Sequence, residues 1–330
     1  MGSRPFEIPA DLDVLAEIIP PSFQYPENES WNVREDEMES MVETMQTMRK
    51  MWPLLRVLQV FVPPFRDIMR GFVWEEENKP VGLVNVIRMG NTRQWLIGNV
   101  AVLPEFRRRG IARKLVEESV AYARGRDASH IMLDVIDGNV PAYELYVKLG
   151  FEHFSGNSEL SFESDTPPDA VPMPEGYRME STSLFNWEPR YMMSQRITPP
   201  EVAKYRPVEQ GRFRQPLPFR VLGPLFLFRA MGFRPTSFFM YHGDQLIAYG
   251  GYDARLRAGG INILSITLDP AHAAVAPFLV RDLTRLVMAE APGRRVEVSV
   301  PHWQNAITVA AEAAGFERRA DMHSLGIVVQ

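Results

Sequence analysis

One ordered series of sequence features occurs twice along this chain of 330 residues. Each half contains a proline-punctuated aromatic segment, a strand-turn-strand pattern, an apolar strand that ends in proline, and a helical stretch that ends in Gly-Phe. The strands end at Pro104 and Pro270, and the Gly-Phe pairs begin at Gly150 and Gly315. Chance readily supplies one such match but not the whole series in order, so the sequence predicts two copies of one fold.

A polar stretch between residues 154 and 174, rich in Ser, Asp, Glu and Pro, separates the two copies. We therefore expect two domains, residues 1–160 and residues 161–330, each long enough to bury a core of its own. In each copy the order is helix, hairpin, strand, helix, strand, helix and strand. This order predicts an α/β fold in which a mixed, mostly antiparallel sheet is covered by helices.

Composition excludes several classes of function. Net charge is −5 with both signs interspersed, so nucleic acid is not expected as a partner. The chain has no cysteine, which excludes disulfides, thiolate metal sites and an acyl intermediate on an enzyme thiol. The six histidines have no metal-ligand spacing, so no metal is expected. Residues 1–10 lack a secretion signal and no apolar stretch is long enough to span a bilayer, so we expect a cytoplasmic protein.

The strongest local signal is an apolar strand that ends near Val102, a short basic loop, and a helix that opens at Gly110. The first N–H groups of a helix have no partner within the helix and carry partial positive charge, so an anion fits there. Glycine permits close approach, Ala112 keeps the next turn small, and nearby arginines add charge. The arrangement predicts a pyrophosphate site; a basic triplet alone would indicate a solvated patch or a localisation signal.

Two segments resemble motifs of the GCN5-related N-acetyltransferases (GNAT). Arg107, Gly110 and Ala112 match the family pattern that cradles the pyrophosphate of acetyl-CoA, and residues 139–151, from Asn139 to Gly150-Phe151, match the motif of its last helix. The resemblance implies acetyl-CoA as co-substrate and a tandem GNAT repeat. The residues expected to contact it are Val100, Ala101, Val102, Arg107, Arg108, Arg109, Gly110, Ile111, Ala112, Arg113, Asn139, Ala142, Tyr143 and Tyr146.

The same resemblance implies a role for several of these residues. Backbone groups of Val100 and Val102 are expected to pair with the pantetheine arm, and the N–H of Val102 to polarise the thioester carbonyl. Asn139 is expected to reach the cofactor from the facing loop. Tyr146 is the expected general acid, which protonates the departing thiolate; the alternative is a helix residue that packs beside Tyr143 and Val147.

The general base is not visible in the sequence. The central strand at residues 95–100 has no acidic residue. Asp134 alternates with Leu133 and Val135 and can point out of the sheet, although a lone carboxylate on a strand more often serves as a structural hydrogen-bond partner. The sequence therefore leaves the base unassigned.

The second copy lacks the polar residues of the first. Residues 270–278 contain neither the arginines nor the glycine, Ala311 stands at the place of Tyr146, and Gln304 at the place of Asn139. We expect this copy to fold alike without binding acetyl-CoA in the usual way. It would complete the acceptor pocket or mimic a dimer within one chain, so the protein is expected to be a monomer with pseudo-dimeric halves or a homodimer.

Two further segments bear on the substrate. Residues 35–52 predict an amphipathic helix with Met38, Met41, Met45, Met48 and Trp52 on one stripe, which indicates core packing or an acceptor-facing surface. Residues 219–233 are aromatic and raise membrane contact as a question, but are too interrupted to span. We predict an enzyme that transfers an acetyl group from acetyl-CoA to an amine of a small molecule or peptide in a ternary complex. A non-catalytic acyl-CoA sensor and peripheral membrane association remain alternatives.

Overall fold

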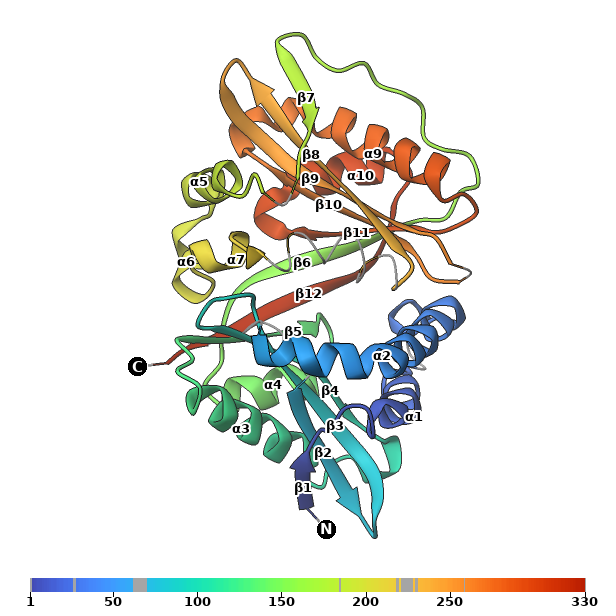
Figure 1. The fold of residues 1–330 in the computed structure, drawn as a ribbon, viewed down its shortest axis with the longest axis vertical. Helices are drawn as coiled ribbons and strands as arrows, with labels where there is room; N and C mark the ends of the chain where they lie inside the picture. Colours follow the sequence, from blue (N-terminus) through green and yellow to red (C-terminus); the bar gives the residue numbers. More distant parts are fainter. Residues whose placement is uncertain are drawn as a thin grey trace. The chain divides into compact units, whose positions relative to one another are not determined.

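The computed structural model describes residues 2–25, 28–61, 70–183, 185–217, 220, 228, 231–257 and 259–329. The chain forms two compact units (Figure 1). Unit 1 comprises Met1–Phe154, Glu201–Pro207 and His323–Gln330, and unit 2 comprises Ser155–Pro200 and Val208–Met322. Division of the chain at residue 160 into two folding domains stays a prediction, because each of these units includes pieces from both sides of that point.

The sheet of unit 1 has the strand order β1-β2-β3-β4-β5-β12. Neighbouring strands from β1 to β4 are antiparallel, and β4 and β5 are parallel. The strands are β1 (Gly2–Pro5), β2 (Arg70–Glu76), β3 (Lys79–Arg88), β4 (Gln94–Val102), β5 (His130–Ile136) and β12 (Glu317–Val328), of which the residues from His323 onward belong to unit 1.

Helices cover both faces of this sheet. Helices α1 (Leu12–Ser22) and α2 (Glu35–Phe61) pack on one face, against Leu83 of β3 and Ala101 of β4. Helices α3 (Ile111–Arg124) and α4 (Val140–Lys148) pack on the other, against Val86 and Ile97. We call these the α1–α2 face and the α3–α4 face. The short helices η1 (Glu29–Trp31), η3 (Pro104–Phe106) and α6 (Pro200–Tyr205) lie in connections.

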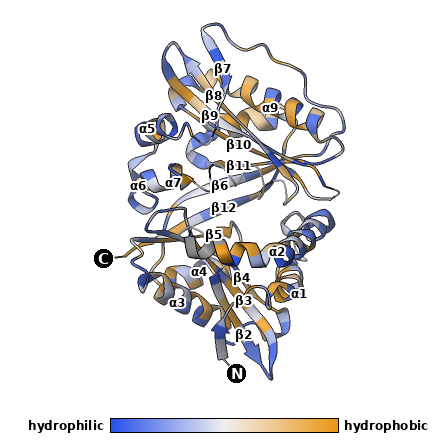
Figure 2. Cartoon of the chain, viewed as in Figure 1, coloured by the Kyte–Doolittle hydropathy of each residue, from blue (hydrophilic) through white to orange (hydrophobic). Residues whose placement is uncertain are grey.

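An apolar stripe forms the buried side of α3. Leu115, Val116, Ser119 and Ala123 are each completely buried, and Ile111 nearly so. These positions recur at helical spacing, which is why this segment is a helix with one buried side. Figure 2 shows the corresponding mixture of apolar (orange) and polar (blue) residues along α3 and α9. Burial of the stripe places the amino end of α3 directly after the basic loop.

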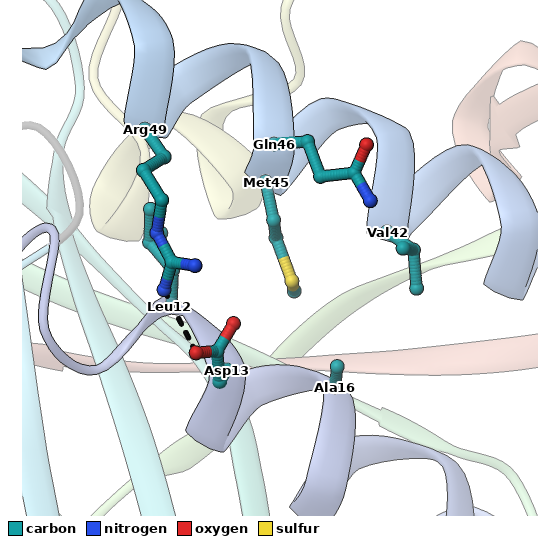
Figure 3. Close-up of a pocket in the computed structure, with 7 residues that line it drawn as sticks. All are labelled: Leu12, Asp13, Ala16, Val42, Met45, Gln46 and Arg49. Atoms are coloured by element: carbon teal, nitrogen blue, oxygen red, sulfur yellow. Dashed lines mark hydrogen bonds and ion pairs between the residues drawn. The ribbon is translucent and has the colours of Figure 1, made fainter.

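The methionine stripe of α2 packs against α1. Met45 is 9% exposed, and Met41 and Met48 pack beside it. A small pocket of about 120 Å³ lies between the two helices, with Met45 pointing into it and an ion pair of 2.8 Å joining Arg49 to Asp13 at its edge (Figure 3). Ligand pockets for small molecules measure roughly 300 to 1,000 Å³. The stripe therefore serves packing, and this pocket is too small for an acceptor.

Unit 2 repeats the same plan. Its strand order is β12-β6-β11-β10-β9-β8-β7, and β10 and β11 are parallel as β4 and β5 are in unit 1. Its core lies between the sheet and the helices α9 and α10. The elements are β6 (Glu152–Phe162), β7 (Tyr177–Ser181), α5 (Glu188–Ile197), α7 (Gln210–Phe213), β8 (Phe233–His242), β9 (Gln245–Arg255), β10 (Asn262–Leu268), η5 (Pro270–Val275), α9 (Ala276–Glu290), β11 (Val296–Pro301), η6 (His302–Gln304) and α10 (Asn305–Ala313). The predicted mixed α/β fold is confirmed. The aromatic segment at residues 219–233 lies largely outside the described residues.

The last strand of the chain completes the sheet of unit 1. Leu325 is completely buried in the core of the α3–α4 face, and Ile327 and Val329 pack against that core. The Val329 N–H donates to the carbonyl of Ser129 at 2.8 Å, just before β5 begins. The first unit therefore depends on residues from the far end of the chain.

Candidate active site

Strand β4 contains a bulge and then separates from β5. Leu83 is paired with Ala101 but Asn85 with Gly98, so β4 has one extra residue at this point, and Asn99 adopts a φ of 50°. The Asn99 side chain donates to Oδ1 of Asn85 at 2.9 Å across the bulge. Pairing of β4 with β5 ends at Ile97 and Leu133. Bulges of this kind re-aim a strand and are frequent beside active sites.

The separation leaves part of β4 with a free edge. The Leu103 N–H donates to Val81 on the β3 side at 3.0 Å, so strand alternation turns the N–H and carbonyl of Val102 toward the gap. The carbonyl accepts a hydrogen bond from Nε of Arg107 at 3.2 Å. In the described part of the chain, the N–H of Val102 has no acceptor. This donor therefore points toward the gap between β4 and β5.

The loop after β4 exposes a series of backbone donors. Arg108 has a φ of 62° and Gly110 a φ of 79°, and the first helical hydrogen bond is from Lys114 to the Gly110 carbonyl at 3.2 Å. The six N–H groups of residues 108–113 donate no hydrogen bond to any described residue. A side chain at Gly110 would point into open space, with no atom within 4 Å of its Cβ. Successive N–H groups at a helix start form an anion-binding concavity.

The predicted arginines divide into two groups. Arg107 spans from the Val102 carbonyl to the carbonyl of Ser22 at the end of α1 (3.0 Å), and Arg109 pairs with Glu76 at 3.2 Å. These two stabilise the loop. Arg108 is exposed and forms no hydrogen bond or ion pair with the residues that the structure describes. Arg113 has only a weak contact of 3.5 Å with Glu117, so these two side chains remain available to an anion.

Asn139 lies between the end of β5, the strand on the other side of the gap, and the start of α4. Its Oδ1 caps α4 by accepting from the Ala142 N–H at 3.4 Å, and its Nδ2 donates to the hydroxyl of Tyr25 at 3.4 Å. Asn139 therefore positions α4 and the connection between α1 and α2. The neighbouring Tyr143 packs edge-on to His323, with ring centroids 5.4 Å apart.

Tyr25 and Trp31 are site residues that the sequence analysis missed. Their rings meet edge to face at 5.4 Å, and Trp31 lies so close to Gly138 that a Cβ there would be 2.7 Å from the indole. Burial raises the pKa of Tyr25, although Arg107 and the hydrogen bond from Asn139 lower it. Tyr25 and Trp31 lie in a polar connection without a periodic pattern, so the sequence did not indicate that they belong to the site.

Tyr146 lies beneath this connection. It is 6% exposed and its ring meets that of Phe151 at 6.1 Å. Burial raises the pKa of the Tyr146 hydroxyl above its ordinary value, and the nearby Tyr25 raises it further. The hydroxyl has no hydrogen-bond partner among the described residues. Tyr146 thus carries its proton at neutral pH, as a proton donor requires, while also packing in the core.

Unit 2 closes the equivalent gap with its own side chain. Pairing of β10 with β11 ends at Leu264 and Val298, so Leu268 lies beyond the last pair, as Val102 does in unit 1. Gln304 accepts from the Leu268 N–H at 3.0 Å and donates to the Leu268 carbonyl at 2.9 Å. It is 4% exposed. The strand edge that stays open in unit 1 is therefore already paired in unit 2.

Among the described residues, no group of three or more His, Asp or Glu side chains is arranged to hold a metal ion. No helix in the described ranges is long and apolar enough to cross a membrane.

Residues 26–151 match the model of the acetyltransferase (GNAT) family, and the fold of the chain is of the GNAT type. Two solved structures share this fold over nearly the whole chain. A tandem GNAT protein from the clavulanic acid biosynthesis pathway has a TM-score of 0.63 at 13% identity, covering 98% of this chain and 97% of that one. A GCN5-related N-acetyltransferase from Sphaerobacter thermophilus has a TM-score of 0.64 at 14% identity, covering 98% and 95%. The predicted GNAT-type fold is confirmed, and the two solved structures are consistent with the predicted tandem arrangement.

One characterised enzyme is similar in sequence. Streptothricin acetyltransferase from Streptomyces lavendulae is 38% identical over 64 residues, which are 19% of this chain and 34% of that protein. The match thus spans about a third of that enzyme. It supports an acyltransferase and leaves the acceptor to be established.

Proposed function

We propose that this protein transfers an acetyl group from acetyl-CoA directly to an amine of a small molecule or peptide, in a ternary complex. One observation carries the proposal. The six N–H groups of residues 108–113, which have no acceptor among the described residues, adjoin a strand edge whose Val102 N–H faces the gap between β4 and β5. A diphosphate and an amide chain are the ligand groups that such donors fit.

The residues present fit acetyl-CoA, which would supply an acetyl group activated as a thioester. Arg108 and Arg113 lie at the helix start with side chains available to a diphosphate. The N–H of Val102 is a fixed dipole that favours negative charge on an oxygen in the gap. Tyr146, which is buried near Tyr25, holds its proton and would deliver it to a departing thiolate.

The acceptor is proposed from the relative's name. Streptothricin acetyltransferase acts on streptothricin by its name, so an amine-bearing small molecule is the first acceptor class to test here. The closed strand edge at Gln304 supports one acetyl-CoA site per chain rather than two.

Calorimetry and a thiol assay test the proposal together. We expect one coenzyme A per chain, and release of free thiol from acetyl-CoA when streptothricin or another primary amine is added. Because the chain has no cysteine, a thiol reagent reports coenzyme A alone. Absence of coenzyme A binding would refute the proposal. Binding without thiol release for any amine would instead support the acyl-CoA sensor.

A further inference from the structure

The sheet of unit 2 has a second face, opposite to the core that packs under α9 and α10. On β9, Tyr252 and Ala254 belong to that core, so the alternating residues Gly251 and Asp253 point to the second face. Tyr249, four residues before Asp253, points the same way and packs against the small apolar cluster that α5 forms with the sheet. We call this surface the α5 face of unit 2.

Asp253 carries a charge without a partner on the α5 face. It lies between Pro235 of β8 and Ile263 of β10. Its carboxylate is half-buried and forms no hydrogen bond or ion pair with the described residues. Burial alone raises the pKa of the Asp253 carboxyl. Because removal of an unpaired charge from water is unfavourable, Asp253 costs the ligand-free protein stability.

Arg190 carries the opposite charge, also without a partner. It lies on α5, one helical turn before Ser194, whose hydroxyl is 2.8 Å from the Tyr249 hydroxyl. Nε of Arg190 is buried without a hydrogen-bond partner, and the guanidinium forms no ion pair in the part of the chain that the structure describes. Burial lowers the pKa of Arg190, and the nearby Tyr249 partly offsets this shift. The guanidinium therefore lies near Tyr249, on the same face as Asp253.

Small residues form the surface between the two charges. Gly251 pairs with Ser237 of β8 and with Ser265 of β10, so these three residues make one row across the sheet between Tyr249 and Asp253. The hydroxyls of Ser237 and Ser265 form no hydrogen bond with any described residue. Tyr249 and Asp253 are four residues apart on one strand, about 13 Å between their Cα atoms. A ligand that lies along β9 can thus reach both charges.

We propose that the α5 face of unit 2 binds a small zwitterion, with its ammonium group at Asp253 and its carboxylate at Arg190. The ligand supplies the two counter-charges that the described residues do not provide, and it can hydrogen-bond to the serine hydroxyls between them. The two charges of an α-amino acid are too close together to reach both residues, so an ω-amino acid or a short peptide fits the spacing. This site goes beyond the proposed function, because it lies in the other unit and involves no chemical step.

Calorimetry with compounds of one or two charges tests the spacing. We expect one 6-aminohexanoate to bind per chain. Glycine, whose charges are adjacent, should bind about tenfold more weakly or worse. Hexylamine and hexanoate, which each carry one charge, should do the same, because each loses one charge-assisted contact.

Two variants test the residues. Asp253→Asn and Arg190→Met should each weaken binding of 6-aminohexanoate about tenfold or more, since one charge-assisted contact is lost. Asp244→Asn and Arg234→Gln are the matched controls and should bind normally. Asp244 is exposed between β8 and β9. Arg234 points to the opposite face, where it pairs with Glu290 at 3.1 Å.

Thermal unfolding gives a measurement that a structural role would move the other way. Because both charges lack partners in the ligand-free protein, Asp253→Asn and Arg190→Met should each raise the unfolding temperature at neutral pH by about 2 to 4 °C. Loss of a structural contact would lower it. Addition of 6-aminohexanoate should raise the unfolding temperature of the unaltered protein and of neither variant.

Failure of this inference is distinct from failure of the proposed function. No binding of 6-aminohexanoate, binding no tighter than that of hexylamine and hexanoate, or normal binding by both variants would overturn the zwitterion site. So would a lowered unfolding temperature in both variants, which would mean that the two charges stabilise the fold. Coenzyme A binding and thiol release by the unaltered protein do not depend on any of these outcomes.

Discussion

The side-chain amide of Gln304 pairs with both backbone groups of Leu268, at 3.0 Å to the N–H and 2.9 Å to the carbonyl. Val102 lies two residues before Pro104, as Leu268 lies two residues before Pro270, and its N–H has no acceptor within the part of the chain that the structure describes. A primary amide has the same donor and acceptor as a pantetheine amide. One side chain thus accounts for the difference between a strand edge open to ligand and a closed one.

Replacement of Gln304 by Ala should destabilise unit 2 without opening a working site. The N–H and carbonyl of Leu268 would be left unsatisfied, at about 1 to 3 kcal/mol for each buried group. Urea unfolding measures this loss. Gln195→Ala is the control, because Gln195 is exposed on α5 and should change stability by less than about 0.5 kcal/mol. An unchanged unfolding free energy in Gln304→Ala would contradict the assignment.

Gly110→Val should abolish coenzyme A binding. A valine at a φ of 79° is strained by about 1 to 3 kcal/mol, and its side chain would occupy the open space before the helix. Calorimetry with coenzyme A measures the loss. Gly125→Ala, at the other end of α3 with a φ of −63°, should bind normally. Normal binding by Gly110→Val would mean that the diphosphate lies elsewhere.

Tyr146→Phe should slow acetyl transfer while coenzyme A affinity stays nearly constant. The ring still packs against Phe151, but the proton donor is gone, at a cost of roughly 10²-fold or more in rate. Thiol release and calorimetry on the same preparation separate the two effects. An unchanged rate would assign Tyr146 to packing alone.

Stability should fall in alkali partly through Tyr146. Its pKa is raised in the folded protein, so above about pH 10 the unfolded chain loses the phenolic proton while the folded state retains it. Stability from this group is therefore complete below pH 10 and declines as pH rises further. Urea unfolding at a series of alkaline pH values should show a shallower decline in Tyr146→Phe; parallel curves would exclude the effect.

Leu325→Ala should destabilise unit 1, although most of this unit comes from the first half of the chain. The side chain is completely buried in the core shared with α3 and α4, so the expected loss is about 2 to 5 kcal/mol. Val328 on the same strand is 42% exposed, and Val328→Ala should cost far less. The unfolding temperature of both variants is measured with and without coenzyme A. If Leu325→Ala leaves stability unaltered, β12 is not part of this core.

The sequence predicted those features that are encoded within a short stretch of chain. The basic loop and the helix opening at Gly110 depend on neighbours a few residues away, so their spacing is visible in one dimension. The resemblance to GNAT motifs rests on the same stretch of chain, and the predicted GNAT-type fold is confirmed. Arg107 shows the limit: its residue type was visible in the sequence, but its hydrogen bonds to Val102 and Ser22 were not.

Only the tertiary structure decided the rest. Asp134 was visible as a strand carboxylate, yet its hydrogen bond to Ser324 depends on which strands pair. Tyr25 reaches Asn139, and Gln304 reaches Leu268, through contacts between distant segments. The periodicity of a sequence indicates the secondary structure of one helix or strand. It does not indicate which other helix or strand packs against it. The sequence by itself therefore determined the helix opening and the GNAT-type fold, whereas strand pairing decided which end of the chain completes unit 1.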